Sequence, residues 1–230
     1  KKPSSGPRPG DDMHNMLETK MNKLVFARSL LGGAAMVAMS LPSQAQTAYV
    51  SSEKDHTLTV IDLKTQAVTG TVATCKRPRH VQVTPDGKKL LVACAESNAA
   101  DVIDLATRKS VGRLAIGEDP EAFDLSPDGK TLYISQEDDA ALGFFDIASG
   151  KFTRTVEVGK EPEGVKASPD GKLVWVTSEV ANMVHVVDAA TGKVIKNIKV
   201  GKRPRRLALT PDGSQLRVTN EMSASVREVS

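Results

Sequence analysis

Charged side chains flank a proline at four equally spaced points of the sequence. The prolines recur every 42 residues, at Pro78, Pro120, Pro162 and Pro204. Their neighbours are Arg77, Arg79, Asp119, Glu121, Glu161, Glu163, Arg203 and Arg205. A further position with this spacing holds Glu53, Glu137, Glu179 and Glu221, and only Ala95 interrupts it. These side chains can form a polar docking ring for a ligand or partner, or Arg–Glu ion pairs that join neighbouring units. Exposed pairs recur in repeats for structural reasons, although each contributes only ~0–1 kcal/mol, and this favours the second interpretation.

Other residue types that carry chemistry show no such order. The four histidines, His14, His56, His80 and His185, share no spacing. The sequence has no Cys-x-x-Cys-His haem attachment site, Gly-rich phosphate loop, His-Glu-x-x-His or Gly-x-Ser-x-Gly. The aspartates of the Pro-Asp-Gly sequences are interpreted as turn residues and not as metal ligands. We therefore predict no catalytic residue, no metal and no cofactor.

The whole chain after residue 46 follows the same 42-residue period without an insertion. The quartet Thr84-Pro85-Asp86-Gly87 returns at residues 126–129, 168–171 and 210–213. Aspartates that follow apolar residues recur at Asp62, Asp104, Asp146 and Asp188. A period of about 40–45 residues that holds several short strands is typical of β-propeller blades.

One repeat contains four predicted strands. They cover residues 79–84, 90–94, 101–105 and 111–116, where apolar residues alternate with polar ones or form a continuous run. Pro-Asp-Gly forms the first hairpin, Glu96-Ser97-Asn98 a polar loop, and Asp104 caps the next turn with its side chain. Helical solenoids need apolar spacings of three and four residues, and a parallel β-helix lacks regular Pro-Asp-Gly hairpins, so both are disfavoured.

We therefore expect an all-β fold, a β-propeller of four-stranded antiparallel blades. Whole blades are predicted at residues 79–116, 121–158 and 163–200, with a partial blade at each end. The expected structure is an open arc of about four and a half blades out of seven. In the alternative, residues 205–210 serve as the innermost strand of the first partial blade and close a ring of four.

In a propeller, the loops that lead into the innermost strands open on the same face as the loops between second and third strands. The charged neighbours of the four prolines lie in the first set of loops. Glu53, Glu137, Glu179 and Glu221 lie at the edge of the second set. We therefore expect one charged face around the mouth of the central channel.

The first 45 residues have a different character from the repeats. Residues 21–45 match a secretory signal: Lys23 and Arg28 precede the thirteen small or apolar residues 29–41, and cleavage is expected after Ala45. The alternative, a membrane anchor, needs ~20 apolar residues. Residues 1–20 are interpreted as an upstream segment without a fold, and residues 46–230 as the propeller. The expected location is periplasmic or secreted, with no membrane span after cleavage.

The charge balance changes when the predicted signal is removed. The full chain has 31 basic and 28 acidic residues, and residues 1–45 hold six and three of these. The remaining 25 basic and 25 acidic residues cancel. The composition therefore has no excess of basic residues to form the basic face that nucleic-acid binding needs.

The two cysteines, Cys75 and Cys94, occupy different repeat positions. An oxidising compartment permits a disulfide between them. Cys75 stands where other repeats have Gly117, Gly159 and Gly201, at a loop between blades, and Cys94 lies in the second strand of the next blade. This placement favours two separate small residues.

The repeat also resembles a known family. Ala-Tyr-Val-Ser-Ser at 48–52, Thr-Val-Ile-Asp at 59–62, Arg-Pro-Arg at 77–79 and Thr-Pro-Asp-Gly at 84–87 resemble the YVTN-type β-propeller repeat over residues 48–230. Asp-Pro-Glu at 119–121, Glu-Pro-Glu-Gly at 161–164, Arg-Pro-Arg at 203–205, Gln-Glu-Asp-Asp at 136–139 and Ser-Glu at 178–179 resemble more particularly the propeller proteins associated with pyrroloquinoline quinone-dependent catabolism. The resemblance implies a periplasmic, seven-bladed protein encoded with quinoprotein alcohol oxidation systems.

Two functions follow as hypotheses. The first is a non-catalytic binding or scaffold propeller whose protein partner is a quinoprotein dehydrogenase, a cytochrome or a transport component. The second is a propeller enzyme with its site at the channel mouth, either a lactonase or a haem- or quinone-dependent oxidoreductase.

Overall fold

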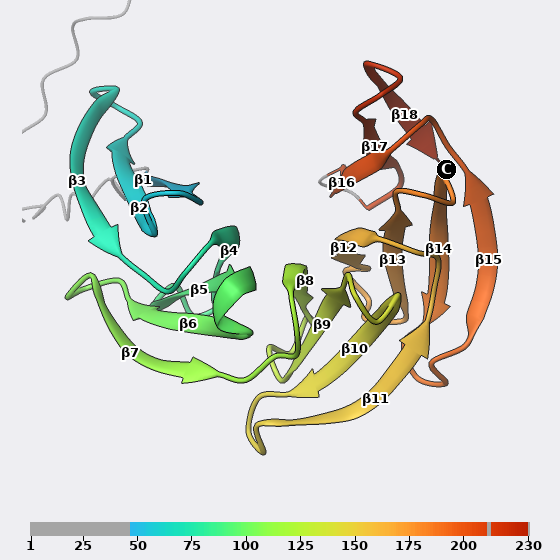
Figure 1. Cartoon of the computed structure of the whole chain (residues 1–230), viewed down its shortest axis with the longest axis horizontal. Helices are drawn as coiled ribbons and strands as arrows, with labels where there is room; N and C mark the ends of the chain where they lie inside the picture. Colours follow the sequence, from blue (N-terminus) through green and yellow to red (C-terminus); the bar gives the residue numbers. More distant parts are fainter. Residues whose placement is uncertain (1–46, 211–212, 230) are drawn as a thin grey trace, which may run out of the picture. The chain divides into compact units, whose positions relative to one another are not determined.

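The computed structural model describes residues 47–210 and 213–229. The upstream segment 1–20, the signal 21–45 and the fourth Pro-Asp turn at 211–212 lie outside the described residues. Figure 1 shows the described residues as a β-propeller, whose sheets follow one another around a common centre with their first strands innermost. Within these ranges, no helix is long and apolar enough to cross a membrane.

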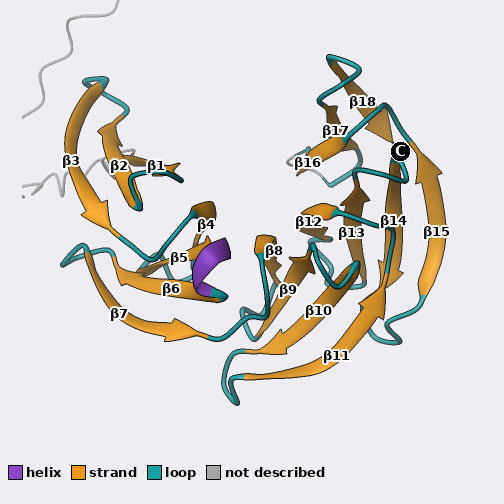
Figure 2. Cartoon of the chain, in the orientation of Figure 1, coloured by secondary structure: helices purple, strands orange, loops and turns teal. Residues whose placement is uncertain are grey.

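The strands form five antiparallel sheets, in chain order. The first blade has the strands β1 (Thr47–Ser52), β2 (Thr57–Asp62) and β3 (Ala67–Ala73). The second has β4 (Pro78–Val83), β5 (Lys89–Cys94), β6 (Ala99–Asp104) and β7 (Lys109–Leu114), with the 3-10 helix η1 (Ala95–Ser97). The third has β8 (Pro120–Leu125), β9 (Thr131–Gln136), β10 (Ala141–Asp146) and β11 (Lys151–Glu157). The fourth has β12 (Pro162–Ala167), β13 (Leu173–Ser178), β14 (Met183–Asp188) and β15 (Val194–Lys199). The fifth has β16 (Pro204–Leu209), β17 (Leu216–Asn220) and β18 (Ser225–Val229). Figure 2 shows that apart from η1 the described chain consists of strands and loops.

The expectation of about four and a half blades out of seven in an open arc is wrong, because the chain forms five blades. The two terminal segments each contain three strands that pair among themselves and make a sheet of their own. The four-bladed alternative is also wrong, because β16 pairs with β17 of its own blade. The predicted boundaries of the three four-stranded blades agree with the structure to within two residues.

The core lies between neighbouring blades, where their sheets face each other. The largest cluster, between the second and third blades, includes Leu91, Ile116, Phe123, Ile134 and Phe145. Comparable clusters fill the other three junctions. Strands buried on both faces read as continuous apolar runs, and this explains why β5 lacks alternation, whereas β17 alternates buried and exposed residues.

Side-chain caps close the turns on the face opposite the charged loops. The carboxylate of Asp104 accepts hydrogen bonds from the N–H and hydroxyl of Thr107, both at 2.8 Å, which confirms its predicted role. Asp86 accepts from the Thr84 hydroxyl at 2.6 Å, and Asp128 and Asp170 repeat this bond with Ser126 and Ser168. The Ser168 hydroxyl, the main cause, lowers the pKa of Asp170 to about 2.

These turns also touch one another between blades. The Pro85 ring lies 3.6 Å from the position that a side-chain carbon would take at Gly129. The same contact joins Pro127 to Gly171 at 3.4 Å and Pro169 to Gly213 at 3.3 Å. The three Pro-Asp-Gly turns that the structure describes in full are therefore both hairpins and spacers between blades.

A disulfide joins the first blade to the second, contrary to the sequence interpretation of two separate cysteines. Cys75, after β3, and Cys94, at the end of β5, have Cα atoms 5.7 Å apart. The equivalent residues at other junctions also touch: a side-chain carbon at Gly159 would lie 2.3 Å from the Ser178 hydroxyl, and Gly201 faces Asn220 in the same way. Cysteine at both positions turns this contact into a covalent bond.

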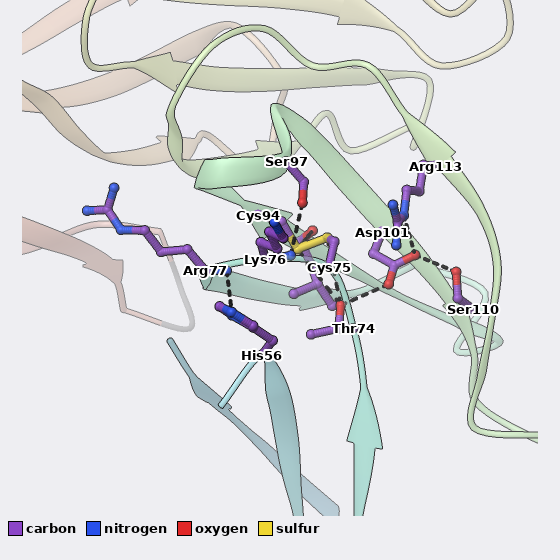
Figure 3. Close-up of a disulfide and its surroundings, with 11 residues drawn as sticks. His56, Thr74, Cys75, Lys76, Arg77, Cys94, Ser97, Asp101, Ser110 and Arg113 are labelled. Atoms are coloured by element: carbon purple, nitrogen blue, oxygen red, sulfur yellow. Dashed lines mark hydrogen bonds and ion pairs between the residues drawn. A yellow bond between two sulfur atoms is a disulfide. The ribbon is translucent and has the colours of Figure 1, made fainter. Parts of the chain in front are cut away.

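Polar groups surround the disulfide (Figure 3). The fully buried carboxylate of Asp101 accepts hydrogen bonds from Thr74 at 2.9 Å and Ser110 at 2.5 Å, and Arg113 lies 3.8 Å away. The Thr74 hydroxyl is also within 4 Å of both sulfur atoms. Buried carboxylates need such partners, so this junction is held by a bonded network as well as by the disulfide.

Candidate functional site

The innermost strands β4, β8, β12 and β16 all begin with a proline at the same face, which we call the mouth. A hydroxyl from the preceding blade, on β1, β9 or β13, fixes three of them. Ser51 donates to the carbonyl of Arg79 at 2.9 Å, Ser135 to that of Glu163 at 2.7 Å, and Thr177 to that of Arg205 at 3.0 Å. The backbone of each of these charged residues is thereby anchored to its neighbouring blade.

The residue before each proline has an unusual backbone. Arg77, Asp119, Glu161 and Arg203 have φ values of 55°, 38°, 53° and 55°. This left-handed region is costly for residues other than glycine, so the surrounding structure must hold them. For three of them the hold is visible: His56 Nδ1 accepts from the N–H of Arg77 at 3.1 Å, and Asn98 and Asn182 accept from Asp119 and Arg203.

Arg79 is the centre of the first group of ion pairs. Its guanidinium contacts Glu53 of the first blade at 2.9 Å, Glu163 of the fourth at 3.2 Å, and Glu121 of the third. Arg77 lies beside it and contacts Asp119 at 3.2 Å and both Glu53 and Glu121 at 3.7 Å. Two arginines of the second blade therefore connect the blades on either side.

Arg205 is the centre of the second group. It contacts Glu163 at 2.8 Å, Glu221 at 3.5 Å, and Glu179. Arg203 contacts Glu179 at 2.6 Å and Glu221 at 3.5 Å. Glu163 contacts both Arg79 and Arg205, so it joins the two groups into one network.

The network contains one arginine that the sequence did not reveal. Arg206 contacts Glu163 at 2.9 Å, on the same side of β16 as Arg205. Strict alternation would send consecutive side chains to opposite faces. A β-bulge between Pro204 and Leu207 breaks this alternation, and each of the other innermost strands has a bulge at the same place.

Burial changes the acidity of the central carboxyl groups. Glu121 is fully buried and Glu163 is 2% exposed. Desolvation raises the pKa of Glu121 to about 7, against the opposing effect of Arg79. Burial also raises the pKa of Glu163 and of Glu137, and a hydrogen bond with Glu121 partly offsets the effect on Glu137. The carboxyl oxygens of Asp119, Glu121 and Glu137 lie within 4.8 Å of one another.

The twelve residues predicted for the charged face all lie at the mouth, and ten of them form the ion-pair network. Glu137 instead interacts with Glu121. Glu161 has no ion pair with a described residue, and its exposed side chain lines a cavity of about 330 Å³. The other lining residues are Glu179, Val180, Asn182, Lys202, Arg203 and Met222. That these groups bind a ligand or partner stays a prediction.

A histidine lies deeper along the innermost strands. The His80 ring packs edge-on against Phe123, with ring centres 4.9 Å apart. Burial, together with the charge of Arg206, lowers the pKa of His80 to about 4. Its position in the sequence gave no sign of this, because the equivalent residues are Ala122, Gly164 and Arg206.

Comparisons with known proteins agree on the fold. Residues 24–117 match the profile of the YNCE-like beta-propeller family. A search of curated proteins finds no match. Among solved structures, a chain of Kuenenia stuttgartiensis hydrazine synthase is 31% identical, with a TM-score of 0.68 over 75% of this chain. A functionally unknown protein from Desulfotomaculum acetoxidans DSM 771 is 16% identical, with a TM-score of 0.64 over 79% of this chain. This chain spans 52% and 65% of their respective lengths.

Proposed function

We propose that this β-propeller repeat protein is a non-catalytic binding or scaffold protein of the periplasm, accessory to a quinoprotein alcohol oxidation system. Its docking surface is the mouth. The observation that carries this proposal is the network of ion pairs in which residues of all five blades meet at one face. Such a network holds the mouth loops in fixed positions, and a preorganised surface loses less entropy on binding.

The disulfide supports the proposed compartment. Disulfides persist in oxidising environments such as the bacterial periplasm and are rare in the cytosol. The Cys75–Cys94 bond is buried at a blade junction, and the signal-like segment at residues 21–45 is consistent with export. The quinoprotein association rests on the resemblance of the residues that flank the mouth prolines.

Capture of a partner from periplasmic extract tests the proposal. The full chain is cross-linked in the extract, and its partners are identified by mass spectrometry. Glu161→Lys changes an exposed mouth residue that has no ion pair with a described residue, and Lys88→Glu is a charge reversal at an exposed turn on the opposite face. We expect a quinoprotein dehydrogenase, a cytochrome or a transport component to be captured by wild type and Lys88→Glu, and much less by Glu161→Lys. Capture that is no higher than background, or equal for both variants, would refute docking at the mouth.

The second candidate function is an enzyme with its site at the mouth, a lactonase or a haem- or quinone-dependent oxidoreductase. The grouping of Asp119, Glu121 and Glu137 favours it, because one buried carboxyl group with a pKa of about 7 is suited to proton transfer. The similarity to a hydrazine synthase chain, which is part of an enzyme, also supports this candidate. Absorbance and elemental analysis of the purified protein discriminate. A visible band or a stoichiometric divalent metal supports the enzyme, and a colourless, metal-free protein supports the binding function.

A further inference from the structure

One loop position at the mouth changes character along the chain. The residue that follows the register of Glu53 is Lys54, Glu96 and Asp138 in the first three blades. In the last two blades the same position holds Val180 and Met222. These side chains are 55% and 71% exposed, and both line the 330 Å³ cavity beside Glu161 and Lys202. The repeat therefore replaces charge by apolar surface at two neighbouring loops that share a cavity.

The turn itself does not require apolar residues there. The N–H of Ala140 donates to the carbonyl of Glu137 at 3.2 Å across Asp138. The N–H of Ala224 donates to the carbonyl of Glu221 at 3.1 Å across Met222. The same turn thus forms around an aspartate and around a methionine. Single exposed apolar residues are ordinary, but two that converge on one cavity mark a contact surface.

The loops of the second and third blades present the opposite chemistry. Glu96, Glu118, Glu137, Asp138 and Asp139 form what we call the acidic lobe, and none of them makes an ion pair with a described basic residue. Arg77 and Arg79, which also lie at the mouth, are already engaged with Glu53, Asp119 and Glu121. The acidic lobe therefore carries negative charge that no ion pair within the described residues compensates.

We propose that the mouth takes a basic segment of a partner protein that carries an apolar anchor. The anchor inserts between Val180 and Met222, and the lysines or arginines of the segment face the acidic lobe. This inference rests on the proposed function and specifies the chemistry of the partner at that surface. Charge complementarity of this kind guides association and selects the partner, while the buried apolar anchor supplies affinity.

A labelled peptide with one leucine between two runs of three lysines tests this chemistry by fluorescence anisotropy. The comparison peptides replace leucine by glycine, or the lysines by glutamates. The double variant Val180→Asp/Met222→Glu installs residue types that this loop position already holds in other blades. It also adds negative charge, which by charge alone would strengthen binding of the basic peptide. Leu63→Asp, at an exposed turn on the opposite face, is the control.

We expect the leucine peptide to bind wild type and Leu63→Asp about tenfold more tightly than the glycine peptide, as the burial of one apolar side chain predicts. The double variant should lose that tenfold difference, and higher salt should weaken binding. Equal affinity for the leucine and glycine peptides, or equal affinity for the glutamate peptide, would overturn the proposal. Displacement of the lysine peptide by millimolar calcium alone would also overturn it and would identify the acidic lobe as a cation site.

The peptide experiment and the capture experiment test separate claims, so failure of the further inference can be told apart from failure of the proposed function. If Glu161-dependent capture persists while the lysine peptide does not bind, docking at the mouth stands and its basic, apolar chemistry is wrong. If neither is observed, both are wrong.

Discussion

The two buried glutamates at the mouth, Glu121 and Glu163, have raised pKa values and make the stability of the fold depend on pH. Glu121 has a pKa of about 7 when folded, well above its ordinary value of 4.5, because burial disfavours its charged form. The folded protein therefore holds this proton more tightly than the unfolded chain does. As a result, the contribution of Glu121 to the free energy of unfolding is largest below about pH 4.5 and declines as the pH rises to about 7.

Glu121→Gln should remove this pH dependence, because the amide resembles the protonated carboxyl group and does not titrate. We expect the variant to be more stable than wild type above neutral pH, by roughly 3 kcal/mol, and nearly equal to it at acidic pH. The measurement is the free energy of unfolding in urea for both proteins across this range. Parallel pH profiles would show that Glu121 titrates as an ordinary carboxyl group.

Single residues were also where sequence reasoning reached its limit. All twelve charged positions were found by their 42-residue spacing, because equivalent positions of a repeat occupy equivalent places in the fold whatever the local backbone geometry is. Arg206 was missed because a β-bulge places it beside Arg205, and bulges leave no mark in a hydrophobic pattern. The disulfide did leave a mark: Cys75 and Cys94 replace pairs such as Gly159 and Ser178, whose atoms touch at an equivalent junction. The replacement of both residues of such a pair by cysteine, 19 residues apart, was the sequence signal that could have predicted the disulfide.

At the scale of elements, the strands followed from the sequence closely. The predicted strand at 90–94 corresponds to β5 (Lys89–Cys94), and the predicted strand at 101–105 to β6 (Ala99–Asp104). Periodic apolar residues and Pro-Asp-Gly turns fix such boundaries locally. How the terminal strands associate is decided by pairing and packing over long range, so the number of blades was not predictable in the same way.

Removing the disulfide should loosen the first two blades. The double variant Cys75→Gly/Cys94→Ser installs the residues that the junction of Gly159 and Ser178 already uses, so packing is conserved and the covalent link is lost. A cross-link over 19 residues restricts the unfolded chain by an amount worth about 3 kcal/mol. We expect a loss of this size in urea unfolding of the oxidised protein, and no difference between the proteins under reducing conditions. A difference that persists in reductant would point to packing instead of the cross-link.

The contact between the fourth and fifth blades depends on a glycine. A side-chain carbon at Gly164 in β12 would lie 2.3 Å from the carbonyl oxygen of Arg205 in β16, a backbone atom that cannot move aside cheaply. Gly164→Ala should therefore separate these strands and destabilise the fold by about 1–3 kcal/mol.

Gly112→Ala is the matched control for that substitution, because nothing lies within 4 Å of a side-chain carbon at Gly112 in β7. It should leave the thermal unfolding midpoint unchanged or slightly raised. Similar midpoints for the two variants would mean that β12 and β16 separate without cost.

At the scale of the whole molecule, Arg79 ties three blades to its own. It is 11% exposed and contacts Glu53, Glu121 and Glu163, of which the last two are buried. Arg79→Ala leaves these carboxylates short of a partner, and breaking a buried pair in this way costs about 3–5 kcal/mol. Arg217→Ala breaks an exposed pair with Glu228 and should cost ~0–1 kcal/mol.

Thermal unfolding of the two variants, measured beside partner capture, separates structure from recognition. If Arg79 serves only the network, Arg79→Ala should lower the melting temperature and still capture the partner at a temperature where it is folded. Loss of capture at an unchanged melting temperature would instead make Arg79 a contact residue.

The contacts between the Pro-Asp-Gly turns have a consequence for how such a chain can evolve. Pro85 meets Gly129, Pro127 meets Gly171 and Pro169 meets Gly213, always 44 residues apart. The bonds at the mouth keep fixed separations of 21 and 28 residues. Recombination that removes or duplicates a whole repeat re-creates every one of these junctions, whereas a change of any other length breaks them on both faces at once. Such a chain can therefore gain or lose complete blades only. This explains why the repeats contain no insertions, because an insertion of any other length would disrupt the junctions.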